Sequence, residues 1–115
     1  MNVMSARSSK AKGRRLQNFV RDLLRSTFKN KLEDDDIKSQ IMGVNGEDIV
    51  LSPAAKKILP FSIECKNVEK FSIWKSLKQT EANTANGSTP LLIFKRNNTK
   101  TYVVEDINTW IKRIK

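Results

Sequence analysis

The segment FSIECK, residues 61–66, decides how this sequence is interpreted, because it places two opposite charges inside an apolar strand. Alternate residues of a strand point to the same face. Glu64 and Lys66 would therefore project together, while Ile63 and Cys65 face the other way. Burying charges is costly unless they are paired or bind something. The segment predicts either a functional carboxylate and lysine or, in the simpler alternative, a salt bridge at a strand end.

A second carboxylate, Asp48, opens the strand expected before this segment, directly after a turn at Gly46. If the two strands are neighbours, Asp48 lies beside Glu64. Converging carboxylates favour a hard divalent cation such as Mg²⁺ or Mn²⁺, and the backbone carbonyl of Cys65 could complete its ligands. The cation would polarise a phosphate and lower the pKa of a bound water. Lys66 would orient that water or stabilise the charge of the transition state.

The periodicity of the apolar residues around these segments predicts an α/β fold in the order αββ(α)βαββα. Helices are expected at residues 12–28, 54–59, 72–86 and 106–114. Ser52-Pro53 is a helix-start signal for the second of them, with Ser52 as N-cap and Pro53 at the first helical position. Strands are expected at residues 37–42, 48–51, 61–66, 90–96 and 100–104, and the first two are expected to form a hairpin. We expect one domain over residues 12–115, with a central mixed β-sheet flanked by helices, after a flexible basic arm at residues 1–11.

The helix expected at residues 72–86 has two distinct faces. Its polar face repeats at every fourth residue: Lys75, Gln79 and Asn83. Its apolar face should pack on the sheet: Trp74, Leu77 and Ala85. Both tryptophans, Trp74 and Trp110, are expected to anchor the core rather than to stack on bases.

The residue types that are missing exclude several classes of enzyme. The chain of 115 residues has no histidine and a single cysteine, Cys65. Histidine general bases, Ser-His-Asp triads, HNH-type nucleases, internal disulfides and structural zinc sites are therefore excluded. No apolar run approaches the roughly 18 residues that span a bilayer. No apolar stretch follows the basic N-terminus, so we expect no signal peptide and a cytoplasmic protein with no membrane partner.

The net charge of +10 is unevenly distributed along the chain. Residues 1–31 hold nine bases and one acid, residues 32–48 one base and six acids, and residues 49–115 twelve bases and five acids. Basic charge favours a polyanion such as DNA, because neutralised phosphates release counterions. Cation binding would explain part of the acidic stretch, although a solvated loop is the favoured interpretation for Glu33 to Asp36. The bases favoured for phosphate contacts, each of which could instead serve only solubility, are Lys12, Arg14, Arg15, Lys75, Lys95 and Arg96.

Two separated segments carry a resemblance to a known family. Gly46-Glu47-Asp48-Ile49, followed by Ile63-Glu64-Cys65-Lys66, resembles the PD-(D/E)XK nuclease signature. The order of elements resembles the restriction-endonuclease-like fold of that superfamily. Gly13-Arg14-Arg15-Leu16-Gln17 and Met42-Gly43 resemble small phage and archaeal endonucleases of the Holliday-junction-resolvase type. The resemblance covers about residues 12–115.

This resemblance implies roles for individual residues. Asp48 and Glu64 would bind the metal, Lys66 would be the catalytic lysine, and Gln79 would lie near the active site. Glu47 stands where the signature has proline. Many relatives also carry a glutamate on the first helix, where this chain has Gln17. Glu47 and Gln17 are therefore possible auxiliary residues, and a site with three carboxylates is doubtful.

The function expected from these features is a metal-dependent DNA endonuclease that hydrolyses phosphodiester bonds. By its small size and resolvase-like order it would act on branched DNA, and a homing or restriction-type duplex cutter is the alternative. Cutting two strands implies a homodimer or a higher symmetric assembly. A bacterial or phage-infected cell would be its setting. Alternatives of other classes are a non-catalytic nucleic-acid-binding module with a decayed nuclease fold and a basic interaction protein with no nucleic-acid role.

Overall fold

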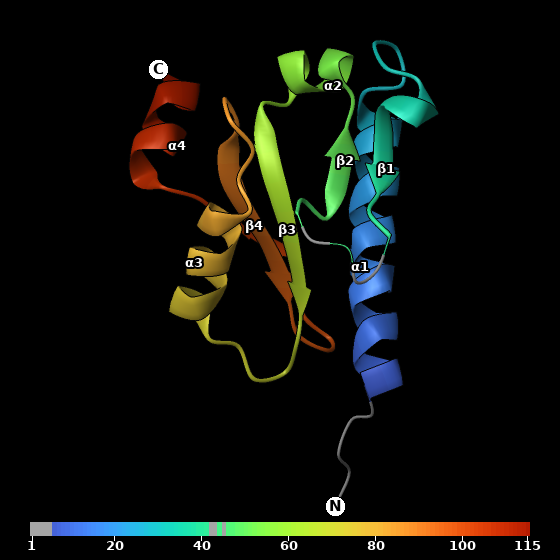
Figure 1. The fold of residues 1–115 in the computed structure, drawn as a ribbon, viewed down its shortest axis with the longest axis vertical. Helices are drawn as coiled ribbons and strands as arrows, with labels where there is room; N and C mark the ends of the chain where they lie inside the picture. Colours follow the sequence, from blue (N-terminus) through green and yellow to red (C-terminus); the bar gives the residue numbers. More distant parts are fainter. Residues whose placement is uncertain (1–5, 42–43, 45) are drawn as a thin grey trace, which may run out of the picture.

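The computed structural model describes residues 6–41, 44 and 46–115, and it confirms an α/β fold in the expected order (Figure 1). A short 3-10 turn, η1, precedes the first strand. The helical segments are α1 (Ala6–Thr27), η1 (Asp34–Asp36), α2 (Pro53–Ile58), α3 (Ile73–Ala82) and α4 (Ile107–Ile114). The strands are β1 (Ile37–Ser39), β2 (Ile49–Leu51), β3 (Phe61–Asn67), β4 (Thr89–Lys95) and β5 (Tyr102–Val104).

Helix α1 begins earlier than the sequence predicted. Residues 6–11, expected as part of a flexible arm, are helical, and the rest of that arm lies outside the described residues. No glycine or proline precedes Gly13 within the helix, so nothing in the local sequence opposes its extension. The buried side chains of Leu16 and Val20 pack α1 on β1 and β3. No helix in the described part of the chain is both long and apolar enough to cross a membrane.

The strands form a three-stranded sheet and a separate hairpin, where one central sheet was predicted. In the sheet β3 pairs with β4 in parallel and β4 pairs with β5 antiparallel, so it is mixed as expected. Strands β1 and β2 form the predicted hairpin, but β1 ends at Ser39 and not at the predicted Met42, which lies outside the described residues. The main-chain N–H of Asp48 donates to the carbonyl of Ile63 at 2.9 Å. The hairpin therefore meets the sheet at the point where Asp48 lies against β3.

The two faces of β3 are both covered, which fixes where its polar side chains point. Figure 1 shows β3 between α1 and α3. Ile63 and Cys65 belong to the apolar cluster that also contains Leu16 and Val20 of α1. The predicted alternation is thereby confirmed for this face, and Glu64 is left on the opposite side of the strand.

Helix α3 ends at Ala82, four residues before its predicted end at Asn86, and Asn83 is its C-cap. The residues that pack on the sheet are Ser76 and Thr80, whose short side chains let the helix lie close to the strands. The Thr80 hydroxyl donates to the Ser76 carbonyl at 2.7 Å, so its buried polar group is satisfied. Trp74 is 81% exposed, and the prediction that it anchors the core was wrong.

Helix α2 follows its sequence signals closely. Ser52 caps it by accepting a hydrogen bond from the Ala55 N–H at 3.1 Å, and Pro53 is its first residue, as predicted. Ala55 is its buried residue. The helix therefore links β2 to β3 through a short, well-defined turn, and this connection places Asp48 and Glu64 on neighbouring segments.

Candidate active site

A pocket of about 270 Å³ lies where α1, the residues before β2, β3 and α3 meet. It brings together the three residues on which the sequence prediction rested, Asp48, Glu64 and Lys66. Gln17 of α1 and Gln79 of α3, both singled out from the sequence, also line it. These side chains come from segments that are far apart in the chain, so the fold rather than local sequence creates the site.

Asp48 is held in place by both its main chain and its side chain. Its carboxylate Oδ2 accepts a hydrogen bond from the Cys65 N–H at 2.7 Å. The main-chain carbonyl of Asp48 accepts from the Gln40 N–H at 2.8 Å and from the Gln17 Nε2 at 3.3 Å. Gly46, with a φ of +110° that other residues rarely adopt, turns the chain into this position. The aspartate is therefore fixed against β3 before any ligand binds.

Glu64 is the most strongly perturbed carboxylate of the pocket, and it is only 5% exposed. Burial, together with the charge of Asp48, raises its pKa to about 7, while the charge of Lys66 and a hydrogen bond with Asn83 oppose the rise. Burial also raises the pKa of Asp48, against the opposing effects of the Cys65 N–H, Lys66 and Gln17. Two carboxylates in this position repel one another when both are ionised. A bound cation would relieve that repulsion.

The donor set of the pocket fits a hard divalent cation. Besides the two carboxylates, the Oε1 atom of the buried Gln17 has no hydrogen-bond partner within the described chain. Buried polar atoms are normally satisfied, so this amide oxygen is open to a ligand or an ordered water. Carboxylate and amide oxygens are ligands that Mg²⁺ and Mn²⁺ accept. Over the described residues, no group of three or more acidic or cysteine side chains converges on one point, so the doubtful third carboxylate is not found there.

Asn83 is the residue of this pocket to which the sequence had assigned no role. It lines the pocket and hydrogen-bonds the Glu64 carboxylate. Its helical spacing from Gln79 had placed it on the same face of α3 as Gln79, but nothing in the sequence indicated a contact with Glu64. The Cys65 thiol is buried and its pKa is raised by that burial, which makes it an unreactive packing residue.

Glu47 does not belong to this pocket, and its predicted auxiliary role is corrected. Its carboxylate pairs with the Lys56 ammonium and accepts from the Ser62 hydroxyl at 2.5 Å. Lys56 also donates to the Phe61 carbonyl and to the Ser88 hydroxyl, each at 2.8 Å. Glu47 therefore helps to tie α2 and the start of β3 together. Its Oε2 atom is engaged in structure, at the position where the signature has proline.

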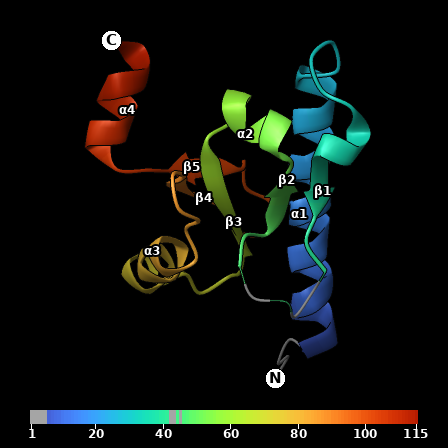
Figure 2. The same ribbon diagram turned by 45° about the horizontal axis from the view of Figure 1, so that its top comes forward.

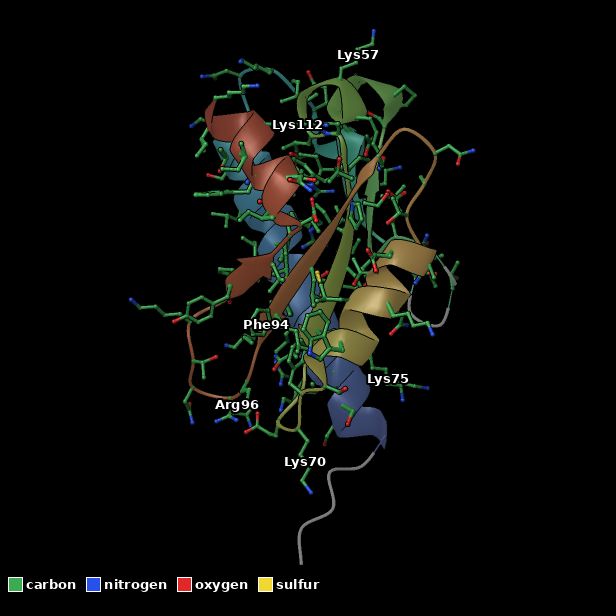
Figure 3. All side chains as sticks on the ribbon, turned by 90° about the vertical axis from the view of Figure 1, so that its left-hand side faces the viewer. Lys57, Lys70, Lys75, Phe94, Arg96 and Lys112 are labelled. Atoms are coloured by element: carbon green, nitrogen blue, oxygen red, sulfur yellow. The ribbon has the colours of Figure 1, made fainter. Side chains whose placement is uncertain are left out.

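The basic residues expected to contact DNA divide into two groups. Lys12 is buried, and its Nζ lies 3.6 Å from the Glu69 carboxylate, so its prediction as an open phosphate contact is corrected. Four of the predicted bases are exposed, Arg14, Arg15, Lys75 and Arg96, and Lys95 is half-buried. Figure 3 shows Lys75, Arg96 and also Lys70 near the same end of the molecule, where α1 begins. A basic surface therefore lies at that end.

Comparison with protein families gives one match, which covers almost the whole chain. The model of a family described as "Phage putative PDDEXK endonuclease" matches residues 8–114. Comparisons with curated proteins and with solved structures found no match. The matched range contains every residue that lines the pocket.

Proposed function

The chain belongs to this phage PDDEXK endonuclease family, and on that premise we propose that it is a metal-dependent DNA endonuclease acting through Asp48, Glu64 and Lys66. Membership in the PD-(D/E)XK superfamily supports a nuclease activity in general. The observation that carries the proposal is the convergence, in one pocket, of a lysine and two carboxylates whose pKa values are both raised. Such perturbation is typical of functional sites.

Asp48 and Glu64 would hold Mg²⁺ or Mn²⁺, with the Gln17 amide oxygen and the Cys65 carbonyl as further oxygen donors. When bound, the ion supplies Lewis-acid activation of the phosphate and a water of lowered pKa. Lys66 lies on the same strand face as Glu64 and lines the same pocket. Its ammonium would donate to the attacking water or to a phosphate oxygen, which stabilises the added negative charge of the transition state. Gln79 would hold the water or a phosphate oxygen from the side of α3.

The DNA would reach this pocket along the basic end of the molecule. Arg14 and Arg15 directly follow Gly13, which lines the pocket, and both are exposed. Lys75 and Arg96 extend the positive surface (Figure 3). By its resolvase-like sequence order, the preferred substrate is branched DNA, met in the cytoplasm of a bacterial or phage-infected cell. Two cuts need two pockets, so the active form is a homodimer or a higher symmetric assembly.

A nicking assay tests the proposal directly. The protein is incubated with a four-way junction and with a linear duplex of the same sequence, with Mg²⁺, Mn²⁺ or neither. We expect cleavage with either metal, faster on the junction, and loss of cleavage in Asp48→Ala and in Glu64→Ala. Exclusive cutting of the duplex would replace the branched substrate with a restriction-type one. Full activity in both variants would overturn the assigned site.

The alternative of a DNA-binding module with a decayed site predicts salt-sensitive binding and no cleavage with any divalent cation. A binding module gains nothing from two buried carboxylates that would repel a phosphate. The intact Asp48, Glu64 and Lys66 therefore favour catalysis.

A further inference from the structure

The apolar face of α4 is only partly covered in the described chain. Its four large apolar side chains are 43% to 67% exposed: Ile107, Trp110, Ile111 and Ile114. Figure 2 shows α4 at the end of the connection from β5, and its Arg113 guanidinium lies over the Phe61 ring of β3, 5.5 Å from the ring centroid. A helix of eight residues is only marginally stable in water without packing on something else. The predicted core role of Trp110 was therefore wrong for the single chain, and the apolar face of α4 needs a partner.

A second apolar surface, the α1 groove, lies between α1 and the three-stranded sheet. It has a volume of about 820 Å³, and its apolar walls include Phe19 and Leu23 of α1 and Val103 of β5. Each of these three side chains is more than half exposed. Val103 also lines the hollow that contains Ile107 and Trp110 of α4. The two apolar surfaces are therefore continuous around β5, which has a paired neighbour on one side only.

The size of α4 matches the size of the α1 groove. Eight helical residues extend for about 12 Å, and the ten residues of α1 from Arg15 to Leu24 that line the groove extend for about 15 Å. A helix whose large apolar residues lie on one side is suited to such a groove. The chain thus carries both a ridge and a hollow of similar length.

Charge supplies the direction in which α4 would lie in the α1 groove. The last turn of α4 contains Lys112, and Lys115 is the C-cap of the helix; both side chains are exposed. Asp34 and Asp35 of η1 follow the end of α1, and both are exposed with no ion pair inside the described chain. A helix that ran along the groove in the direction of α1 would point its basic end toward the end of α1 from which η1 follows. Figure 1 shows α4 and η1 on opposite sides of one end of the molecule, so the contact is not made within one copy.

We propose that α4 of one copy docks in the α1 groove of a second copy, with its basic end on Asp34 and Asp35, and that the exchange is reciprocal. The occupant is a second copy because the chain carries both complementary surfaces, as a two-fold symmetric interface requires. This proposal also gives a use to the acidic stretch, which the active site does not employ beyond Asp48. It names the surface of the homodimer expected from the proposed function and in that sense rests on it. The assembly itself is measured without any cleavage assay.

The first test is the mass of the protein in solution, measured by sedimentation equilibrium from about 1 to about 100 µM. We expect a dimer at the upper concentration. Trp110→Ala removes a central apolar contact and should raise the dimer dissociation constant by more than about thirtyfold, as should Leu23→Glu in the groove. Trp74→Ala removes the equally large tryptophan of α3, which lines neither the α1 groove nor the hollow around Trp110, and is the matched control. A wild-type monomer at about 100 µM, or a dimer insensitive to both substitutions, would overturn the proposal.

A charge-reversal pair distinguishes exchange between copies from folding back within one copy. Lys112→Glu with Lys115→Glu, and separately Asp34→Lys with Asp35→Lys, should each weaken self-association about tenfold. In a mixture of the two variants both α4 contacts of the heterodimer are again between opposite charges, so the heterodimer should form more tightly than either homodimer. Reversal of Lys57 and Lys78 to glutamate, on α2 and α3, is the control of equal charge. Circular dichroism checks that each variant is folded.

The mixing experiment gives a decision for every outcome. Preferential heterodimers support reciprocal docking on the acidic residues. Variants that associate as well as the wild type, or a mixture with no gain, overturn it. A dimer that survives these changes while Asp48→Ala remains inactive shows that the surface is wrong and the proposed active site is right. A dimer that depends on these charges, in a protein that cleaves no DNA, shows that the surface is right and the proposed active site is wrong.

Discussion

In folded proteins charged residues are normally exposed and apolar residues buried, and two regions of this molecule depart from that rule in opposite ways: the pocket beside β3 and the apolar surface around α4. In the pocket, charged groups are buried: Glu64 is 5% exposed and its pKa is raised to about 7. Around α4, apolar groups are exposed, with Trp110 and Ile107 open to solvent. Each arrangement costs stability in the isolated chain. The comparison teaches that each region leaves groups uncompensated within the single chain: buried carboxylates that the proposed cation would neutralise, and apolar side chains that another surface would have to cover.

The largest expected effect is on the chemistry of the pocket. Lys66→Ala should lower the cleavage rate about 10²- to 10⁴-fold, because it removes a positive charge from the developing transition state. The apparent affinity for Mg²⁺ should change little, since two carboxylates hold the ion. Single-turnover cleavage at saturating metal measures the effect, with Lys78→Ala on the exposed face of α3 as the control. Equal rates for the wild type and Lys66→Ala would remove lysine from the mechanism.

The next largest expected effect is the loss of stability when a core residue of β3 is truncated. Ile63 lies in β3 beside Glu64 but faces the apolar cluster with Leu16. Ile63→Ala should lower the free energy of unfolding by about 2 to 5 kcal/mol, through lost burial and the cavity left behind. Urea denaturation measures it. A loss below about 1 kcal/mol would show that β3 is not packed as described.

In metal-free protein, Glu64→Gln should instead raise the free energy of unfolding. The folded pKa of Glu64 lies above its ordinary value of 4.5, so the fold is most stabilised with this group protonated, and that stabilisation is lost as pH rises through about 7. A neutral glutamine should therefore raise the free energy of unfolding at pH 8 by about 1 to 2 kcal/mol while abolishing metal binding. Glu81→Gln on the surface of α3 is the control. A destabilised Glu64→Gln would mean that the carboxylate serves structure.

The same group predicts the pH dependence of metal binding. A proton and the cation compete for Glu64, so the affinity for Mn²⁺ should fall as pH drops below about 7 and level off above it. Calorimetric titration between pH 6 and 8.5 measures this, and affinity that is flat across the range would exclude Glu64 as a ligand. Gln17→Glu should add a third carboxylate to the pocket, which should increase the affinity for the ion and lower the stability of the metal-free protein.

The smallest expected effect is on stability, when the exposed Trp74 of α3 is truncated. Trp74 is 81% exposed, so Trp74→Ala should change the free energy of unfolding by less than about 0.5 kcal/mol. A clearly larger loss, measured by urea denaturation, would show that α3 is covered in solution and that the apolar surface extends beyond α4.

Features that depend on residues close together in the chain could be predicted from the sequence better than features that depend on distant segments. The alternation within FSIECK and the cap at Ser52-Pro53 are local, and both were confirmed along with the α/β order. The convergence of Asp48 and Glu64 followed because the helix between their strands is short. Roles that depend on distant segments were missed or wrong. Lys12 is buried beside Glu69, and Glu47 is engaged by Lys56.

The tryptophans show the same limit from the apolar side. Size and periodicity on their helices predicted burial for Trp74 and Trp110, but both are exposed in the single chain. Ser76 and Thr80 pack on the sheet in place of Trp74, because close approach of α3 to the strands favours short side chains. A hydrophobic pattern indicates that a face is apolar and does not say which surface covers it.

The metal dependence of cleavage in the wild type and in Asp48→Asn tests the central claim most directly. Asparagine keeps the size of the side chain and removes the charge that, with Glu64, would hold the cation. We predict that the wild type cuts DNA with Mg²⁺, stops when EDTA is added and recovers with excess Mg²⁺, and that Asp48→Asn is slower by at least about 10³-fold. Cleavage that is indifferent to EDTA, or an Asp48→Asn protein as active as the wild type, would contradict the account.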